Sequence, residues 1–293
     1  MEAYIIDGLR SAVTKSKRGG FRNFRSDDLA VLVIKALMAK YPMIEPGLVD
    51  DVIVGCANPE GEQGLQIGRN ISSRALGKEV AGMTVNRYCA SGLETIAIAT
   101  AKIKAGMGHI YVAGGAESMS LIPMTGYKMA PSYQAAMENV NYHVSMGATA
   151  EAVAVKYGVS REESDAFAYR SHQLAGKAIA DGKFSASIHP VEVTEVTVEN
   201  NKRKESTITV SMDDGVRTDT SVEALAKLPA VFKNGGVVTA GNSSQTSDGA
   251  AFTLVVSEEI VKRYNLQPVA RLASCSVGGV DPLYMGIGPC VAI

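Results

Sequence analysis

The residue of this sequence best placed to do chemistry is Cys89, in the stretch VNRYCASGLETIAIA at residues 85–99. A single cysteine stands there where a polar strand end gives way to an apolar, helix-like run. Such a thiol faces the free N–H groups of the first helical turn, whose partial positive charge favours thiolate over thiol. A thiolate attacks thioesters and carbonyls. The small residues from Ala90 to Gly92 leave room for a substrate carbonyl, and the N–H of the cysteine can face the resulting oxyanion.

Local context also allows a second interpretation, a buried structural cysteine at a tight junction. The other cysteines, Cys56, Cys275 and Cys290, lie far apart, and no C-x-x-C spacing occurs. This pattern argues against zinc and iron–sulfur sites, so we expect no metal. Cys56 and Cys275 lie in apolar runs and are predicted to be core residues. Sparse cysteines without an export signal fit a reducing cytosol, so we expect a cytoplasmic protein.

The segments around Cys89 alternate between short apolar runs and longer periodic ones. A helix at residues 26–41 has Ser26 or Asp27 as its predicted cap. This βαβαβαβ rhythm predicts a layered α/β sheet. The remaining elements that we predict are strands at 3–7, 51–56, 83–88 and 110–118 and helices at 64–76 and 90–106.

The rhythm breaks after Ser118, where a segment rich in Met, Pro and Tyr has no clear period. A capping box of Ser160 and Glu163 then predicts a helix. A hairpin is predicted from 191–198 and 206–212, around a solvated turn at 199–205 that contains the basic run Lys202-Arg203-Lys204. Buried strands return at 251–257 and 269–277. We therefore interpret residues of about 119–248 as an insertion in the first α/β domain.

Composition narrows the functional classes. The chain has 293 residues, 46% apolar and 20% charged, which is ordinary for a globular protein. A net charge of −1 and the absence of Trp give no support for nucleic-acid binding. Uninterrupted apolar runs are too short for a membrane span. Glycine-rich nucleotide-binding motifs do not occur either.

Six segments resemble the thiolases. NRYCASGLETI is similar to the family's nucleophile segment N-x-x-C-x-S-G, and the six segments follow the family order across nearly the whole chain. The resemblance implies that Cys89 is the nucleophile that moves an acyl group between a 3-ketoacyl-CoA and CoA. The other five segments are GGAESMS (114–120), MGATAE (146–151), SREESDAFAYRSHQLA (160–175), GGVVTAGNSSQTSDGAA (235–251) and DPLYMGIGP (281–289).

The resemblance also implies a fold. It is a thiolase-like layered α-β-α half-domain, expected at residues 1–118 plus 249–268. An inserted α+β loop domain at 119–248 is expected to bind CoA. Residues 269–293 are expected to begin a second half-domain of similar fold. No covalently bound cofactor is implied, because CoA and acyl-CoA are substrates.

Six positions match family residues that contact the substrate. Arg217 matches the residue beside the nucleotide end of CoA, and Ala240 and Ser244 match contacts to the pantetheine arm. Met146 matches the methionine of the acyl pocket, and Leu228 and Phe232 match apolar pocket positions. From the residues alone, Arg217 and Ser244 can equally be turn residues, and Met146 can be general core packing.

Thiolases continue further, with an N-E-A-F segment, a G-H-P histidine that activates the nucleophile, and a C-x-G cysteine that acts as acid and base. None of these occurs in residues 1–293. We therefore expect a truncated thiolase, and no turnover by a polypeptide of these residues alone.

The subtype is expected to be degradative, as in fatty-acid β-oxidation. Short-chain biosynthetic relatives often carry a histidine where this chain has Ser145. Residues 121–145 lack the basic loop associated with tetramers, so a homodimer is expected before a homotetramer. The alternatives are a biosynthetic acetoacetyl-CoA thiolase, a ketoacyl-synthase-like condensing enzyme, and a non-catalytic thiolase-like protein that binds acyl-CoA or lipid.

Overall fold

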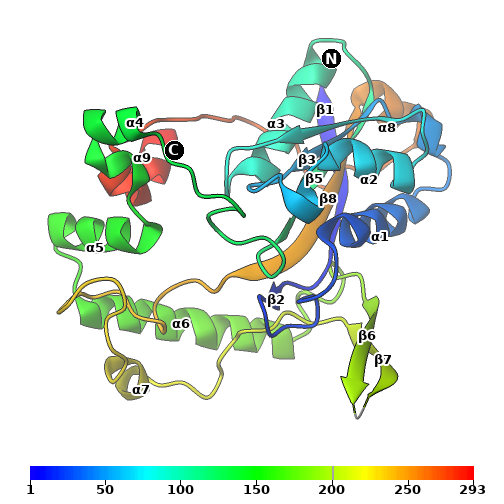
Figure 1. Cartoon of the computed structure of the whole chain (residues 1–293). Coiled ribbons are helices and arrows are strands. Elements are labelled where there is room, and N and C mark those ends of the chain that lie inside the picture. Colours follow the sequence, from blue (N-terminus) through cyan, green and yellow to red (C-terminus); the bar gives the residue numbers. More distant parts are fainter. Residues whose placement is uncertain (200) are drawn as a thin grey trace. The chain divides into compact units, whose positions relative to one another are not determined.

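The computed structural model of the chain describes residues 1–199 and 201–293, which form two compact units. Unit 1 comprises Met1–Tyr127, Phe184–Gly215 and Thr246–Ala273. Unit 2 comprises Lys128–Lys183, Val216–Gln245 and Ser274–Ile293. Figure 1 shows the helices and strands of each unit. The half-domain and insertion boundaries expected from the sequence stay a prediction.

Unit 1 is built on one mixed sheet with the strand order β1-β8-β5-β3-β4 (Figure 1). Strands β4, β3 and β5 run parallel, and β8 pairs antiparallel with both β5 and β1. Parallel neighbours need crossover connections, which α2 and α3 supply. The carboxyl ends of the parallel strands therefore share one edge of the sheet, where α/β folds commonly bind ligands. The strands are β1 (Ala3–Arg10), β2 (Thr14–Lys15, paired with β8), β3 (Asp51–Gly55), β4 (Ala81–Val85), β5 (Ile110–Ser118) and β8 (Ser247–Ser257).

Each face of the sheet has its own apolar core. On one face, Val52 and Val54 of β3 belong to a cluster with side chains of α1 and α2. On the other face, Ile53 packs with Ala99 and Ile103 of α3. Successive residues of a strand point to opposite faces, which explains this division. The layered α/β arrangement confirms the predicted fold class. The helical segments of unit 1 are α1 (Ser26–Ala39), η1 (Pro46–Leu48), η2 (Gly61–Gln63), α2 (Ile67–Ala75), α3 (Ser91–Lys104) and α8 (Glu258–Tyr264).

Helix α1 begins at Ser26 without the side-chain cap that was predicted from Ser26 or Asp27. The cap position is Arg25, whose side chain offers no acceptor for the first N–H groups. The Asp27 carboxylate is instead committed to ion pairs with Arg25 at 2.9 Å and Arg74 at 3.1 Å. The Asp27 carboxylate, which the sequence suggested as a cap, thus binds Arg74 from a distant part of the chain instead.

The predicted hairpin is present as β6 (Val191–Glu199) and β7 (Lys202–Val210). The prediction of a turn for the basic run 202–204 is wrong, because these exposed residues already belong to β7. Asn200 of the expected turn lies outside the described residues. The root of the hairpin packs into the core of unit 1 through Val191, Val193 and Val210.

The strand predicted at 269–277 is wrong. Ala270 alone pairs there, in an isolated bridge to Ile5. The N–H groups of Val269 and Ala270 donate to the Ile5 carbonyl at 2.9 and 3.3 Å. Residues 271–280 find no strand neighbour in the described chain, so their apolar pattern has nothing to pair with. Cys275 is accordingly exposed rather than core, whereas Cys56 is buried as predicted.

Unit 2 is mostly helical. The capping box predicted for its longest helix is confirmed, since Ser160 Oγ accepts the Glu163 N–H at 3.1 Å and the Glu163 carboxylate accepts the Ser160 N–H at 2.8 Å. No helix in the described parts of the chain is long and apolar enough to cross a membrane. The helical segments are α4 (Tyr133–Glu138), η3 (Val140–His143), α5 (Met146–Tyr157), α6 (Arg161–Ala180), α7 (Val222–Ala226), η4 (Pro282–Ile287) and α9 (Gly288–Ala292).

Candidate active site

Cys89 lies in the short link between β4 and α3, at the edge of the sheet where the parallel strands end. Its side chain is exposed, and α3 begins two residues later at Ser91. The cap residue Ala90 has no side-chain acceptor for the first-turn N–H groups of α3, and the N–H of Ser91 donates to the Tyr88 carbonyl at 3.0 Å. The strand predicted at 83–88 ends earlier, at Val85. Residues 86–88 therefore belong to the link, where they form the turn before Cys89.

Two glycines shape the surroundings of this turn. A Cβ at Gly55, the last residue of β3, would lie 2.8 Å from Ser91, so the strand end lies directly against the first turn of α3. A Cβ at Gly92 would meet nothing within 4 Å. One side of the helix start is therefore tightly supported, and the other side is open for an approaching thioester. The catalytic role of Cys89 stays a prediction.

Cys56 differs from Cys89 in the two properties that control thiol reactivity. Its side chain is 1% exposed, and burial followed by the neighbouring Glu117 carboxylate raises the pKa of the Cys56 thiol to about 12. Glu117 is itself held in place, because it accepts hydrogen bonds from the Ala57 N–H and the Gln63 amide, both at 2.6 Å. Cys56 is thus a neutral thiol near pH 7 and a packing residue.

Asp248 connects two of the segments singled out in the sequence, 114–120 and 235–251. Its buried carboxylate accepts hydrogen bonds from Ser118 Oγ at 3.1 Å, the Ser120 N–H at 2.9 Å and Ser120 Oγ at 2.5 Å. Ser118 and Asp248 also face each other across the β5–β8 pairing. The aspartate therefore ties the end of β5 to the start of β8.

The six positions expected to contact CoA or the acyl chain all belong to unit 2, and Cys89 belongs to unit 1. Met146 is the first residue of α5, and Phe232 covers the same helix end. A Cβ at Gly147 would lie 2.3 Å from the Phe232 ring, which explains why a glycine follows the methionine. Phe232 therefore lies beside the residue that follows Met146, and Met146 and Phe232 are 46% and 49% exposed.

The remaining predicted contacts lie in the loops of unit 2. A Cβ at Gly241 would lie 2.6 Å from the Leu228 side chain, so Leu228 lies beside the chain that carries Ala240. Arg217 and Ser244 are exposed. The Arg217 N–H donates to His172 Nδ1 of α6 at 3.1 Å. This bond holds the backbone of Arg217 and does not involve its guanidinium.

Buried carboxylates hold the loop that carries Ala240 and Ser244. Glu151 of α5 is 4% exposed and accepts the N–H groups of Val237 at 3.0 Å and Val238 at 2.8 Å. Backbone N–H groups that bond a buried carboxylate gain charge-assisted hydrogen bonds. Helix α5 therefore fixes the start of the loop.

Asp165 of α6 fixes the middle of the same loop. Its carboxylate accepts Asn242 Nδ2 at 2.9 Å and Arg161 Nε at 2.7 Å, and Asp165 is 1% exposed. Arg161 in turn donates to the carbonyls of Leu225 and Leu228 at 2.7 and 2.9 Å. Three of the segments singled out in the sequence, 146–151, 160–175 and 235–251, meet through these side chains.

Sequence reasoning missed Glu151 and Asp165 as individual residues, although it singled out the segments that contain them. The available signal was an acidic residue inside each motif, at a position that helical spacing would turn inward. In isolation, such acids are indistinguishable from the exposed acids of a solvated helix face.

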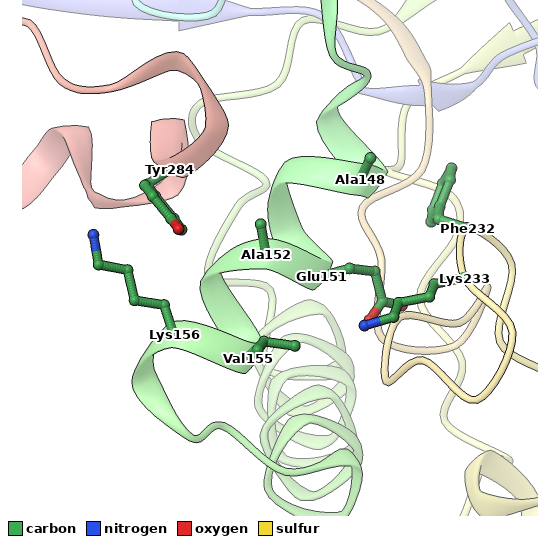
Figure 2. A pocket seen from close by; sticks show the side chains of 8 residues that line it. All are labelled: Ala148, Glu151, Ala152, Val155, Lys156, Phe232, Lys233 and Tyr284. Atoms are coloured by element: carbon green, nitrogen blue, oxygen red, sulfur yellow. The ribbon is translucent and has the colours of Figure 1, made fainter. Parts of the chain in front are cut away.

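A cavity of about 560 Å³ lies on α5 of unit 2, within the usual size range of small-molecule sites. Figure 2 shows Ala148, Ala152 and Val155 along its floor, with the Phe232 ring at one end and Tyr284 at the other. The Lys156 ammonium lies 3.7 Å from the centre of the Tyr284 ring. In residues 1–199 and 201–293, no cluster of three His, Cys, Asp or Glu side chains could hold a metal ion. The cavity thus combines apolar side chains with the acidic Glu151 and the basic Lys156 and Lys233.

Comparison with known proteins gives consistent results. A family model described as the thiolase N-terminal domain matches residues 3–259. The 3-ketoacyl-CoA thiolase of Bacillus subtilis (strain 168) is 48% identical over 294 residues, covering 100% of this chain and 75% of that protein. The β-ketoadipyl-CoA thiolase of Acinetobacter baylyi is 38% identical over 311 residues, covering 99% of this chain and 75% of that protein.

Among solved structures, the acetyl-CoA acetyltransferase of Bacillus anthracis superimposes with a TM-score of 0.85 at 35% identity. That match covers 99% of this chain and 74% of the solved chain. The residues described here therefore correspond to about three quarters of each of these relatives.

Proposed function

This chain belongs to the thiolase family, and from that premise we propose that it transfers acyl groups between 3-ketoacyl-CoA and CoA through a thioester on Cys89. The observation that carries the proposal is the exposed Cys89 thiol at the first turn of α3, inside the segment that matches the family. The contrast with buried, neutral Cys56 supports the choice of cysteine.

In the cleavage direction, the Cys89 thiolate attacks the 3-keto carbon of the substrate. The bond between C2 and C3 then breaks, its electron pair stays on the departing acetyl-CoA enolate, and a proton neutralises that carbanion. The acyl group remains on Cys89 as a thioester, and the thiol of a second CoA takes it up and regenerates Cys89. By resemblance, the proton is moved by the family's G-H-P histidine and C-x-G cysteine, which have no counterpart in residues 1–293.

Unit 2 is proposed as the CoA platform. The exposed Arg217 guanidinium is suited to the phosphate-bearing nucleotide end, and the Ala240–Ser244 loop is suited to the amides of the pantetheine arm. Leu228, Phe232 and Met146 then line the acyl end. The support for this assignment is the anchoring of the loop by Glu151 and Asp165, which keeps backbone groups in one arrangement.

The direction is proposed to be degradative. Ser145 occupies the place of the biosynthetic histidine, and its hydroxyl accepts the Ala148 N–H at 3.4 Å as the cap of α5. The similarity to the 3-ketoacyl-CoA thiolase of Bacillus subtilis supports the same choice. The similarity to an acetyl-CoA acetyltransferase keeps the biosynthetic reaction as the second candidate. A homodimer is proposed as the assembly.

The test is to incubate the protein with acetyl-CoA and map the acetylated peptide by mass spectrometry. We expect the acetyl group on Cys89, its loss in Cys89→Ala, and no effect of Cys275→Ala or Cys290→Ala, two cysteines that are also exposed. Acetylation of a different cysteine would contradict the nucleophile assignment. Binding of acyl-CoA without any acetylation would favour the non-catalytic alternative.

A substrate series separates the two directions. A degradative enzyme should cleave 3-ketoacyl-CoAs longer than acetoacetyl-CoA at comparable rates, and restriction to acetoacetyl-CoA would favour the biosynthetic candidate. A polypeptide limited to residues 1–293 should show no Cys89-dependent thiolysis, because each missing acid or base typically supplies about 10²–10⁴-fold.

A further inference from the structure

Tyr88, the residue directly before Cys89, has a left-handed backbone conformation with φ of 45°. L-residues other than glycine pay for this conformation, because their Cβ crowds the backbone carbonyl. Such a residue persists where its surroundings hold it. The contacts of its two flanking peptide groups therefore show which side chains impose the conformation.

The peptide group on the N-terminal side of Tyr88 is held by Asn86. Asn86 Oδ1 accepts the Tyr88 N–H at 2.9 Å, and Asn86 Nδ2 donates to the Ala57 carbonyl at 2.9 Å. Ala57 follows β3, and its own N–H donates to the Glu117 carboxylate at 2.6 Å. Asn86 thus links the turn before Cys89 to a fixed point at the end of the neighbouring strand.

The peptide group on the C-terminal side of Tyr88 is held by Ser91. Ser91 Oγ donates to the Tyr88 carbonyl at 2.6 Å and accepts the Arg87 N–H at 2.8 Å. The Ser91 N–H also donates to the Tyr88 carbonyl at 3.0 Å. Ser91 is 4% exposed and packs against Gly55, so its hydroxyl cannot move far.

We propose that Asn86 and Ser91 are positioning residues that hold Tyr88 left-handed and thereby aim the Cys89 thiol. This inference rests on the proposed role of Cys89 as nucleophile. Fixing the peptide plane on each side of Tyr88 fixes both of its dihedral angles, and the Cα of Cys89 follows directly. A return of Tyr88 to negative φ would redirect the thiol, and displacements near 1 Å can cost about 10²-fold in rate.

The test is the rate of acetyl transfer from acetyl-CoA to Cys89 in Asn86→Ala, measured across acetyl-CoA concentrations. We expect the maximal rate to fall about tenfold, because the left-handed preference supplied by Asn86 is of that order. The half-saturating concentration should stay within about twofold, since Asn86 acts through Tyr88. Ser91→Ala should lower the maximal rate less, about threefold, because the N–H of residue 91 still donates to the Tyr88 carbonyl.

The decisive variant is Asn86→Ala combined with Tyr88→Gly. Glycine adopts positive φ without a Cβ clash, so it should restore the maximal rate to within about threefold of the unsubstituted protein. Asn139→Ala is the matched control, because Asn139 Oδ1 makes the same kind of bond to the N–H two residues on, at 2.9 Å, in unit 2. This control should leave the rate unchanged.

Three results would overturn the inference. They are a rate for Asn86→Ala within twofold of the unsubstituted protein, a loss that Tyr88→Gly does not restore, and an equal loss in Asn139→Ala. Alkylation of Cys89 by iodoacetamide, with exposed Cys275 as internal reference, reports the same comparison without an acyl substrate and exposes general unfolding. If the unsubstituted protein is alkylated but never acetylated at Cys89, the proposed function fails, and this inference falls with it.

Discussion

Unit 1 buries an apolar cluster on each face of its sheet, beside buried carboxylates such as that of Asp248, whereas the buried residues described in unit 2 are mostly carboxylates and hydroxyls. Both apolar clusters of the described chain, including Ile53 and Phe252, belong to unit 1. In unit 2, Glu151, Asp165 and Thr239 are 4%, 1% and 0% exposed. Large apolar residues of α6 such as Phe167, by contrast, are 72% exposed.

The difference separates two ways of holding a shape. Apolar burial is strong but non-directional, so it supports a sheet whose geometry is already set by its backbone ladder. Hydrogen bonds to buried carboxylates are directional, so they can fix irregular loops such as 237–243, which have no ladder of their own. The cost is sensitivity, because removing one partner leaves a buried polar group unpaired.

The first prediction compares the same residue type in the two units. Phe252→Ala, in the centre of unit 1, should cost about 3–5 kcal/mol of unfolding free energy, as for other buried phenylalanines. Phe167→Ala, on α6, should change it by less than about 0.5 kcal/mol, because its side chain is 72% exposed. Urea unfolding followed by circular dichroism measures both. Equal costs would show that unit 2 also depends on apolar packing, and the contrast would fail.

The second prediction tests the polar network. Asp165→Ala should cost about 3 kcal/mol, the lower end of the range for breaking a buried ion pair, because Arg161 keeps 20% exposure of its side chain. Asp181→Ala, at the end of the same helix, breaks an exposed pair with Lys177 and should cost less than about 0.5 kcal/mol. Hydrogen exchange of the α6 amides locates the loss. A small effect of Asp165→Ala would mean that the network is dispensable.

The sequence was informative where local rules and tertiary packing agree. The buried run 51–55, the alternating hairpin and the capping box at Ser160 each carry their pattern in neighbouring residues. The segment 269–277 has the same apolar character but lacks a strand partner among the described residues, so the pattern misled. The prediction of Asp27 as a helix cap was wrong for a similar reason, since its carboxylate accepts a hydrogen bond from Arg74, 47 positions away.

The candidate site was predictable by residue type and resemblance, but its supports were not. The residues around Asn86 do not predict its hydrogen bond to the Ala57 carbonyl, 29 positions away. The residues around Asp165 do not predict its hydrogen bond with Asn242, 77 positions away. These contacts depend on how β3 meets β4 and how a loop crosses α6. Long-range hydrogen bonds of this kind are consequences of the fold, and a single sequence does not encode them separately.

A smaller effect than that of Asp165→Ala is expected at Asp213, one of the charged residues of unit 1. The Arg10 guanidinium donates to the two Asp213 oxygens at 2.7 and 2.8 Å, and the Val13 N–H donates at 2.8 Å. Both ionic side chains remain about one fifth exposed, at 23% and 19%, so solvent screens the pair more than the Asp165 pair. Asp213→Asn should therefore cost about 1–2 kcal/mol at pH 7, less than Asp165→Ala.

The pH dependence of that cost identifies its source. Desolvation raises the pKa of Asp213, but the hydrogen bonds from Arg10 and Val13, together with the charge of Arg10, outweigh it and hold the pKa below its ordinary value of 3.8. A depressed folded-state pKa contributes stability above the unfolded-state pKa and loses it as pH falls through the folded-state pKa. The gap in unfolding free energy between the unsubstituted protein and Asp213→Asn should thus be constant from pH 7 to about 5 and narrow below about 4. Urea titrations at each pH measure this gap. A gap that persisted unchanged to the acid limit would assign the role of Asp213 to packing rather than to its charge.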